Sequence, residues 1–193
     1  MADRRVGVFG GTFDPIHVGH LIAAEEARVR LALERVILVP ARVSPHKLDE
    51  DAPAPCEQRY RMVCDAVADN PWFSVSAFEV ERDRPSYTVD TLRHFRAEYG
   101  PDVVLCLIMG MDALQGFARW RDPSGILALA RLVVISRPGY PLSLAEQEQS
   151  VPGLMARTTV LDTVDVGISS TDLRARVRAG LPIRYRVPAV VEQ

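Results

Sequence analysis

Two histidines lie three residues apart near the start of the chain, just after a glycine pair. Gly10 and Gly11 follow a short apolar run at 6–9, and the apolar spacing then becomes helical, so we expect a strand, a tight turn and a helix. Glycines let such a turn adopt positive φ and bring its amides close to a ligand. The helix start adds free N–H groups and the positive end of a dipole, which favour a phosphate group. At this spacing His17 and His20 share one face, from which both could donate hydrogen bonds to a polyphosphate.

Two other interpretations of the histidine pair stay open. An ordinary doubly wound domain could begin with the same strand and turn, with histidines that only satisfy helix amides. This interpretation is disfavoured because neither a dinucleotide-type nor a Walker-type glycine spacing is present. A metal pair is disfavoured because no third Cys, His or carboxylate ligand lies at a familiar spacing nearby. We therefore expect an anion site and no metal ion held by the protein alone.

A second group of polar residues precedes a helical pattern late in the chain. Ser169, Ser170 and Thr171 stand in a row, and Arg174 lies four residues after Ser170, on the same helix face. Three hydroxyls exceed what one N-cap requires, and a guanidinium offers a phosphate two donors in one plane. Alone, this motif would be read as a capped helix with a solvated arginine. Two such helix starts, each after a strand, can meet at the carboxyl edge of one sheet and share the charge of a leaving pyrophosphate.

The elements between these motifs alternate between apolar runs and helical patterns. Strands are expected at 36–40, 73–78, 103–109, 132–135 and, at the sheet edge, 158–164; helices are expected at 18–34, 57–69 and 126–130, with another that begins at 88 and ends at Gly100. The most apolar run, 103–109, should be central, charges at 79–84 should point outward, and 141–155 is uninformative. Strands without alternation are typical of parallel sheets. The pattern predicts an α/β fold, a doubly wound and mostly parallel sheet in a single domain spanning 1–193.

Composition limits the classes of partner. The chain has 193 residues, 48% hydrophobic and 25% charged, as expected for one soluble globular domain. A net charge of −2 offers no long-range attraction for nucleic acid or anionic lipid, so small molecules are the expected partners. Three cysteines without a C-x-x-C spacing, and a polar start without a secretory signal, favour a cytoplasmic protein with reduced thiols.

The first and last motifs carry a resemblance to a known family. The run at 10–20, Gly-Gly-Thr-Phe-Asp-Pro-Ile-His-Val-Gly-His, resembles the signature of the nucleotidylyltransferases with an H-x-G-H element, and more narrowly that of bacterial nicotinate-nucleotide adenylyltransferases. The run at 168–174 is similar to their I-S-S-T-x-[IL]-R element. The resemblance covers about 6–174 and implies a Rossmann-like fold and transfer of an adenylyl group from ATP to nicotinate mononucleotide. It assigns to ATP Gly10, Gly11, Thr12, Phe13, His20, Gly110, Asp112, Ile168, Ser169, Ser170, Thr171 and Arg174.

Three shorter motifs extend the resemblance to the acceptor nucleotide. Pro45-His46-Lys47 resembles the family's P-P-H-K element, although Ser44 replaces the first proline, and Pro85-Ser86-Tyr87-Thr88 resembles an element beside the nicotinate carboxylate. Trp120, between two arginines, matches a tryptophan that packs on the nicotinate ring. Read alone, these residues could be a surface turn, a helix capped by Thr88 and a half-buried tryptophan, and Asp112 could be a helix cap. The residues assigned to nicotinate mononucleotide are His46, Lys47, Tyr87, Thr88, Asp112, Trp120 and Arg137.

The predicted reaction is a direct in-line attack without a covalent enzyme intermediate, because a substrate phosphate is already an adequate nucleophile near neutral pH. The expected catalytic residues are His17, His20, Lys47 and Arg174, with His20 the costliest to lose. Mg²⁺ is expected on the ATP phosphates, held mostly by substrate oxygens. A homo-oligomer stays possible. The alternatives are a pantetheine-phosphate adenylyltransferase, a cytidylyltransferase, or a regulatory module that binds nucleotide without turnover.

Overall fold

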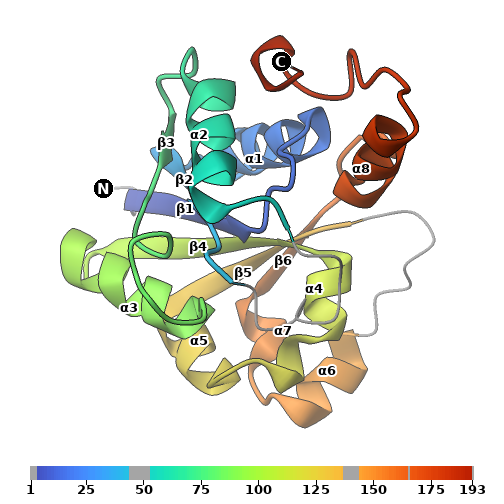
Figure 1. Ribbon diagram of the computed structural model, residues 1–193. Coiled ribbons are helices and arrows are strands. Elements are labelled where there is room, and N and C mark those ends of the chain that lie inside the picture. The colour runs from blue at the N-terminus through green and yellow to red at the C-terminus, as the bar shows by residue number, and fades with distance from the viewer. Residues whose placement is uncertain (1–3, 44–52, 137–143, 165, 193) are drawn as a thin grey trace.

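Six parallel strands form one sheet in the computed structural model, which describes residues 4–43, 53–136, 144–164 and 166–192 (Figure 1). Their order across the sheet is β3-β2-β1-β4-β5-β6, and each neighbouring pair is parallel. The strands are β1 Arg4–Gly11, β2 Arg35–Pro40, β3 Phe73–Val75, β4 Val103–Gly110, β5 Ala130–Ile135 and β6 Thr158–Leu161. The predicted α/β fold with a parallel sheet in a single domain is confirmed.

The chain winds outward from β1 to β3 and then returns to β4, so the strand order reverses between β1 and β4. These two strands pair along most of their length, for example Val8 with Leu107; β4 is almost wholly buried, and β1 is buried from Val6 to Phe9. The apolar run at 103–109 is therefore central, as predicted. In open α/β sheets the crevice outside the carboxyl ends of the strands at such a reversal is the usual ligand site.

Helices cover both faces of the sheet, which makes the fold doubly wound (Figure 1). On one face, α1 and α2 bury alanines and valines against the sheet, among them Ala24 and Val63. On the other, α3 and α5 contribute a larger cluster that includes Leu92, Phe95 and Ile126. The helices are α1 Val18–Arg30, α2 Cys56–Val67, α3 Thr88–Tyr99, α4 Met111–Gln115, α5 Pro123–Leu129, α6 Leu144–Ser150, α7 Leu154–Arg157 and α8 Ser170–Arg178.

Several predicted boundaries differ from the structure. The first helix ends at Arg30 rather than near 34, the strand predicted at 73–78 stops at Val75, and the edge strand stops at Leu161. Helices were predicted from apolar spacing, which continues into the connecting turn and so places the ends too late. In the described ranges, no helix combines the length and apolar character that a membrane crossing requires.

The sequence predicts that the charged side chains at 79–84 all point outward, but one of them does not. Glu79 is buried, with 8% of its surface exposed, and its carboxyl group accepts a hydrogen bond from the Thr91 hydroxyl of α3. Burial raises the pKa of the Glu79 carboxyl group, while hydrogen bonds from Thr91 and Ser86 act in the opposite direction. The hydroxyl partners explain how a single charged side chain in this segment can lie inside.

Candidate active site

The glycine pair completes β1 instead of forming a turn. Gly10 and Gly11 pair in register with Val39 and Pro40 of β2, and neither has positive φ, so the predicted glycine turn is wrong. A Cβ at Gly10 would meet no atom of the described residues within 4 Å, so these residues leave the carboxyl end of β1 open there. A Cβ at Gly11 would lie 2.9 Å from the ring of Phe13. Gly11 is therefore required for packing within the site loop.

Phe13 provides the positive φ that the sequence assigned to the glycines. Its φ is 49°, and its side chain is 2% exposed. A bulky residue in this conformation costs about 1–3 kcal/mol and persists only where the surroundings determine it. The ring of Phe13 packs edge-on against His20, with centroids 5.1 Å apart, and against Phe9, with centroids 5.6 Å apart. The apolar packing of this ring sets the shape of the loop between β1 and α1.

The two predicted catalytic histidines lie side by side at the start of α1. His17 is the N-cap residue, His20 is the third helical residue, and their rings stack with centroids 3.6 Å apart. The His17 backbone N–H donates to Nδ1 of His20 over 3.2 Å. A neutral His20 ring therefore carries its proton on Nε2. The interpretation in which the histidines only satisfy helix amides is partly right, because Nδ1 of His20 accepts the His17 amide. The protonated Nε2 is a donor that this hydrogen bond does not use.

Gly19, between the histidines, brings α1 close to the segment that leads into α8. A Cβ on Gly19 would lie 3.1 Å from the His17 ring and 3.2 Å from a methyl group of Val166. Any larger residue would separate these two parts of the chain. The H-x-G-H spacing therefore has a packing reason as well as a chemical one.

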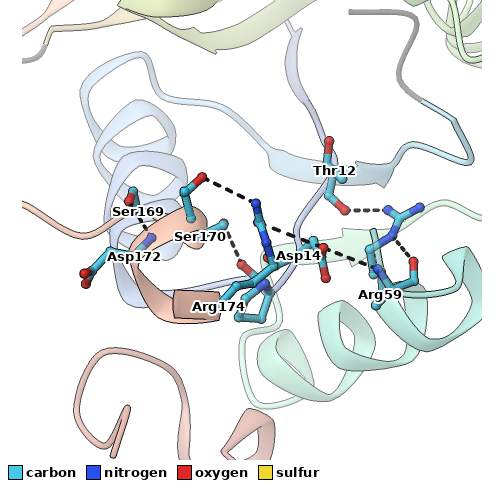
Figure 2. Close-up of polar contacts among 10 residues, drawn as sticks. Thr12, Asp14, Arg59, Ser169, Ser170, Asp172 and Arg174 are labelled. Carbon is cyan, nitrogen blue, oxygen red and sulfur yellow. Dashed lines mark hydrogen bonds and ion pairs between the residues drawn. The ribbon is translucent and has the colours of Figure 1, made fainter. Parts of the chain in front are cut away.

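The second predicted phosphate motif meets the first directly (Figure 2). The Ser170 hydroxyl donates to the Pro15 carbonyl over 3.0 Å, although 155 positions separate them in the sequence. The Arg174 guanidinium donates to the Asp14 carbonyl over 2.9 Å and lies 4.0 Å from the Asp14 carboxylate. The sequence predicts that the two helix starts lie together, and the structure brings them together.

Several hydroxyls and one apolar residue of this motif have structural partners. Ser169 is the N-cap residue of α8, and its hydroxyl accepts the Asp172 N–H over 3.1 Å. A Ser170 hydroxyl that donates to Pro15 cannot donate to a phosphate at the same time. Ile168 packs with the small apolar cluster around Leu173. This leaves the helix amides and Arg174, whose side chain is 23% exposed, as the stronger candidates for phosphate contact. Thr171 is exposed, and its hydroxyl lies 3.4 Å from the Arg174 guanidinium.

The C-terminal segment reaches this site, which the sequence did not indicate. The backbone N–H of Val18, the first residue of α1, donates to the Arg186 carbonyl over 3.0 Å. Ile183 and Val187 anchor the segment against Leu173 of α8. One of the helix-start amides of α1 is therefore satisfied within the chain. Backbone carbonyls carry no side-chain signal, so no motif could have predicted this contact.

Gly110 and Asp112 lie at the carboxyl end of β4, beside β1. Gly110 is the N-cap residue of α4, and a Cβ there would lie 2.5 Å from a carboxylate oxygen of Asp112. The exposed Asp112 side chain therefore turns back over the strand end. Because Asp112 is the second residue of α4, its interpretation as the helix N-cap is wrong. Its carboxylate therefore does not cap the helix and lies exposed at the carboxyl end of β4.

Tyr87, Thr88 and Trp120 come from segments that meet through an arginine. The Arg121 guanidinium lies over the Tyr87 ring, 4.6 Å from its centroid. Tyr87 is the N-cap residue of α3 and Thr88 its first helical residue, so the prediction that Thr88 caps the helix is wrong. The chain turns into the helix one residue earlier than the side-chain preference suggests. Trp120 is half-buried against the larger core cluster, with its ring centroid 5.4 Å from that of Phe117. This agrees with the alternative interpretation of Trp120 as a half-buried tryptophan.

Asp90, in the first turn of α3, is held by two arginines and does not face water. Its side chain is 18% exposed and lies 3.5 Å from the Arg84 guanidinium and 3.4 Å from that of Arg93. The two arginines offset the negative charge that Asp90 would otherwise present near the start of α3.

Three predicted site residues, His46, Lys47 and Arg137, lie outside the described residues.

Two buried charged residues behind the site loop were missed. Asp14 is 6% exposed, and Arg59 of α2 is 1% exposed. Burial lowers the pKa of the Arg59 guanidinium, and the Asp14 carboxylate acts in the opposite direction. The apolar spacing of α2 is ordinary, so the sequence predicts a helix that only supports the fold.

In the described part of the chain, no group of three or more His, Cys, Asp or Glu residues could hold a metal ion.

Comparison with known proteins places these observations in a family context. A family model described as cytidylyltransferase-like matches residues 8–176. A probable nicotinate-nucleotide adenylyltransferase of Roseiflexus sp. (strain RS-1) is 46% identical over 191 residues, 99% of this chain and 94% of that protein. One from Thermus thermophilus is 45% identical over 188 residues, 97% of this chain and 94% of that protein.

Solved structures share the fold at lower identity. Plasmodium falciparum nicotinic acid mononucleotide adenylyltransferase complexed with NaAD superposes with a TM-score of 0.76 at 14% identity, covering 98% of this chain and 93% of that one. A putative nicotinate-nucleotide adenylyltransferase from Vibrio parahaemolyticus gives a TM-score of 0.65 at 21% identity, covering 98% and 97%. The predicted Rossmann-like fold is therefore shared with adenylyltransferases.

Proposed function

This chain belongs to the cytidylyltransferase-like family, and on that premise we propose that it transfers the adenylyl group of ATP to nicotinate mononucleotide, forming nicotinate adenine dinucleotide and pyrophosphate. The family consists of nucleotidyltransferases, and relatives about 45% identical over almost the whole chain are named for this activity. The single observation that carries the proposal is the contact between the two helix starts, where Arg174 donates to the Asp14 carbonyl.

The donor nucleotide lies along the two helix starts in this proposal. Its polyphosphate takes the open carboxyl end of β1 beside Gly10, within reach of the amides of α1 and α8 and of the Arg174 guanidinium. His20 Nε2–H donates to a phosphoryl oxygen, because Nδ1 already accepts the His17 amide. The ribose hydroxyls donate to Asp112, whose exposed carboxylate turns back over the end of β4.

The acceptor lies on the side of Tyr87 and Trp120. The stack of Arg121 on Tyr87 holds these two segments together, which supports a pocket for a flat aromatic ring between them. The start of α3 offers backbone amides to the nicotinate carboxylate, since its N-cap residue Tyr87 makes no side-chain cap. Lys47, His46 and Arg137 complete the acceptor site in the proposal.

The reaction proceeds by attack of a phosphate oxygen of nicotinate mononucleotide on the α-phosphorus of ATP. One P–O bond forms, the bond from the α-phosphorus to the bridging oxygen breaks, and pyrophosphate leaves with the electron pair. Alignment of the two nucleotides supplies on the order of 7–11 kcal/mol of barrier reduction. His20, at the start of α1, stabilises the growing charge, and one such donor is worth about 3 kcal/mol. His17 contributes by stacking on His20 and holding its ring.

Mg²⁺ enters as part of the MgATP substrate. The described residues offer no cluster that could cage the ion, so phosphate oxygens and water supply most of its ligands. When bound, it offsets negative charge on the leaving pyrophosphate.

The test is pyrophosphate release by the whole chain with MgATP and a panel of phosphorylated acceptors. Nicotinate mononucleotide should be the fastest acceptor, and its product should have the mass of nicotinate adenine dinucleotide. Faster reaction with phosphopantetheine, or with CTP in place of ATP, would refute the assignment in favour of another nucleotidyltransferase. An amidated mononucleotide that reacts as well as the acid would refute the role given to the start of α3.

A further inference from the structure

One buried arginine holds three separate segments at the carboxyl edge of the sheet. Arg59 donates to the Thr12 carbonyl after β1 (Figure 2). It also donates, over 2.6 and 3.0 Å, to the carbonyls of Ala41 and Arg42 after β2. It also donates over 2.9 Å to Ala54, just before α2. Five fixed donors on a planar group allow a single side chain to make all these contacts.

Asp14 holds the other end of the same short segment. Its carboxylate accepts the Ala54 N–H over 3.3 Å and lies 4.0 Å from the Arg174 guanidinium. The Thr12 carbonyl and the Asp14 side chain are thus anchored on either side of Phe13. Both anchors lead to the start of α2, where Arg59 and Ala54 lie.

The backbone conformation of Phe13 depends on these two anchors, and the Phe13 ring contacts His20. With a φ of 49°, it holds a backbone conformation that L-residues adopt only when their surroundings determine it. Its ring lies against His20 at a centroid distance of 5.1 Å and an interplanar angle of 81°. Arg59, Thr12, Phe13 and His20 therefore form one continuous line of contacts.

We propose that Arg59 is a positioning residue for the adenylyl transfer: by holding the Thr12 carbonyl it keeps the Phe13 ring against His20 and fixes the direction of the His20 Nε2–H bond. The inference rests on the proposed function, since it gives His20 the task of contacting phosphate. Arg59 touches neither nucleotide in this account and acts only through Phe13.

Arg96 provides a matched control. Its guanidinium also donates to backbone carbonyls, those of Gly100, Val103 and Leu129, over 2.8, 2.7 and 2.9 Å. These carbonyls lie at the end of α3, the first residue of β4 and the end of α5, at the amino edge of the sheet. Arg96 therefore shares the bonding of Arg59 at the edge opposite the site.

The experiment compares Arg59→Lys with Arg96→Lys. Lysine keeps the charge but cannot match the planar fork of donors. Both variants should lose thermal stability, yet only Arg59→Lys should lower kcat, by about tenfold or more, with KM for ATP changed by less than about threefold. Imidazole NMR of the substrate-free chain, which has four histidines, should show a shift of the His20 resonances in Arg59→Lys and not in Arg96→Lys.

Two results would overturn the inference. One is an Arg59→Lys variant that loses stability as Arg96→Lys does but keeps wild-type kcat and unmoved His20 resonances. If Arg59→Lys does not fold, Phe13→Leu tests the same line of contacts, and an unchanged kcat in that variant contradicts it. The NMR measurement needs no substrate, so a different preferred acceptor would refute the proposed function without deciding the role of Arg59.

Discussion

His20 has two hydrogen-bonding tasks on two ring nitrogens, and two substitutions can separate them. Nδ1 accepts the His17 N–H at the start of α1 over 3.2 Å, and Nε2 carries the proton that we assign to a phosphate oxygen of ATP. An asparagine amide lies at about the position of Nδ1, whereas a glutamine amide lies at about the position of Nε2. His20→Asn therefore keeps the capping acceptor and removes the phosphate donor, and His20→Gln does the reverse.

The two tasks differ in size. Loss of a capping acceptor at a half-buried helix start costs about 1 kcal/mol of unfolding free energy, which lowers Tm by about 2–4 °C in a chain of this length. Loss of one charge-stabilising donor costs about 3 kcal/mol of transition-state stabilisation, or about 100-fold in kcat. His20→Asn should thus keep the wild-type Tm and have a kcat about 100-fold lower than wild type. His20→Gln should have a lower Tm than wild type and a kcat within about tenfold of the wild-type value.

The assay is pyrophosphate release at saturating ATP and nicotinate mononucleotide, with thermal unfolding measured on the same preparations. His20→Ala, which lacks both groups, should show both losses. An asparagine variant that turns over as fast as wild type would show that Nε2 is not used. Equal losses of stability and activity in both variants would show that the ring serves packing alone.

Two further predictions concern stability. Ser170→Ala removes the 3.0 Å hydrogen bond to the Pro15 carbonyl and should lower the free energy of unfolding by about 1 kcal/mol. Thermal unfolding measures this against Thr171→Ala, whose hydroxyl makes a longer contact of 3.4 Å. Equal shifts in Tm for the two variants would refute a specific role for the Ser170 bond. Burial raises the pKa of Glu79, so between about 4.3, the value for an exposed glutamate, and the raised value the folded chain keeps a proton that the unfolded chain has lost. Stability contributed by Glu79 is therefore full below this window and is lost as pH rises through it. Glu79→Gln, which cannot titrate, should lose less stability than wild type over that range in urea unfolding, and parallel pH profiles would contradict the assignment.

Sequence patterns could predict the fold and the meeting of the two predicted phosphate motifs for a physical reason. Buried parallel strands carry long apolar runs, and helices that follow such strands all start at the same edge of the sheet. Residues near 10–20 and 168–174 therefore had to lie at one edge, and the Arg174 contact with Asp14 shows how close they come.

The parts that could not be predicted depend on tertiary packing. Local preference assigns positive φ to Gly10 and Gly11, but burial of the Phe13 ring puts it on a phenylalanine. An arginine is expected at the surface, and only the convergence of carbonyls around Arg59 explains its burial. The contact of the Arg186 carbonyl with α1 involves backbone groups that every residue has, so the sequence holds no signal for it.

The claim on which the account depends most is that two nucleotides bound at one sheet edge react in a single step. The stereochemical course at the α-phosphorus tests it most directly, with ATP made chiral by a single sulfur at that phosphorus and nicotinate mononucleotide as the acceptor. Direct attack within the site formed by the starts of α1 and α8 predicts inversion of configuration in the dinucleotide product. Retention would require two displacements through an adenylylated residue of the chain and would contradict the account.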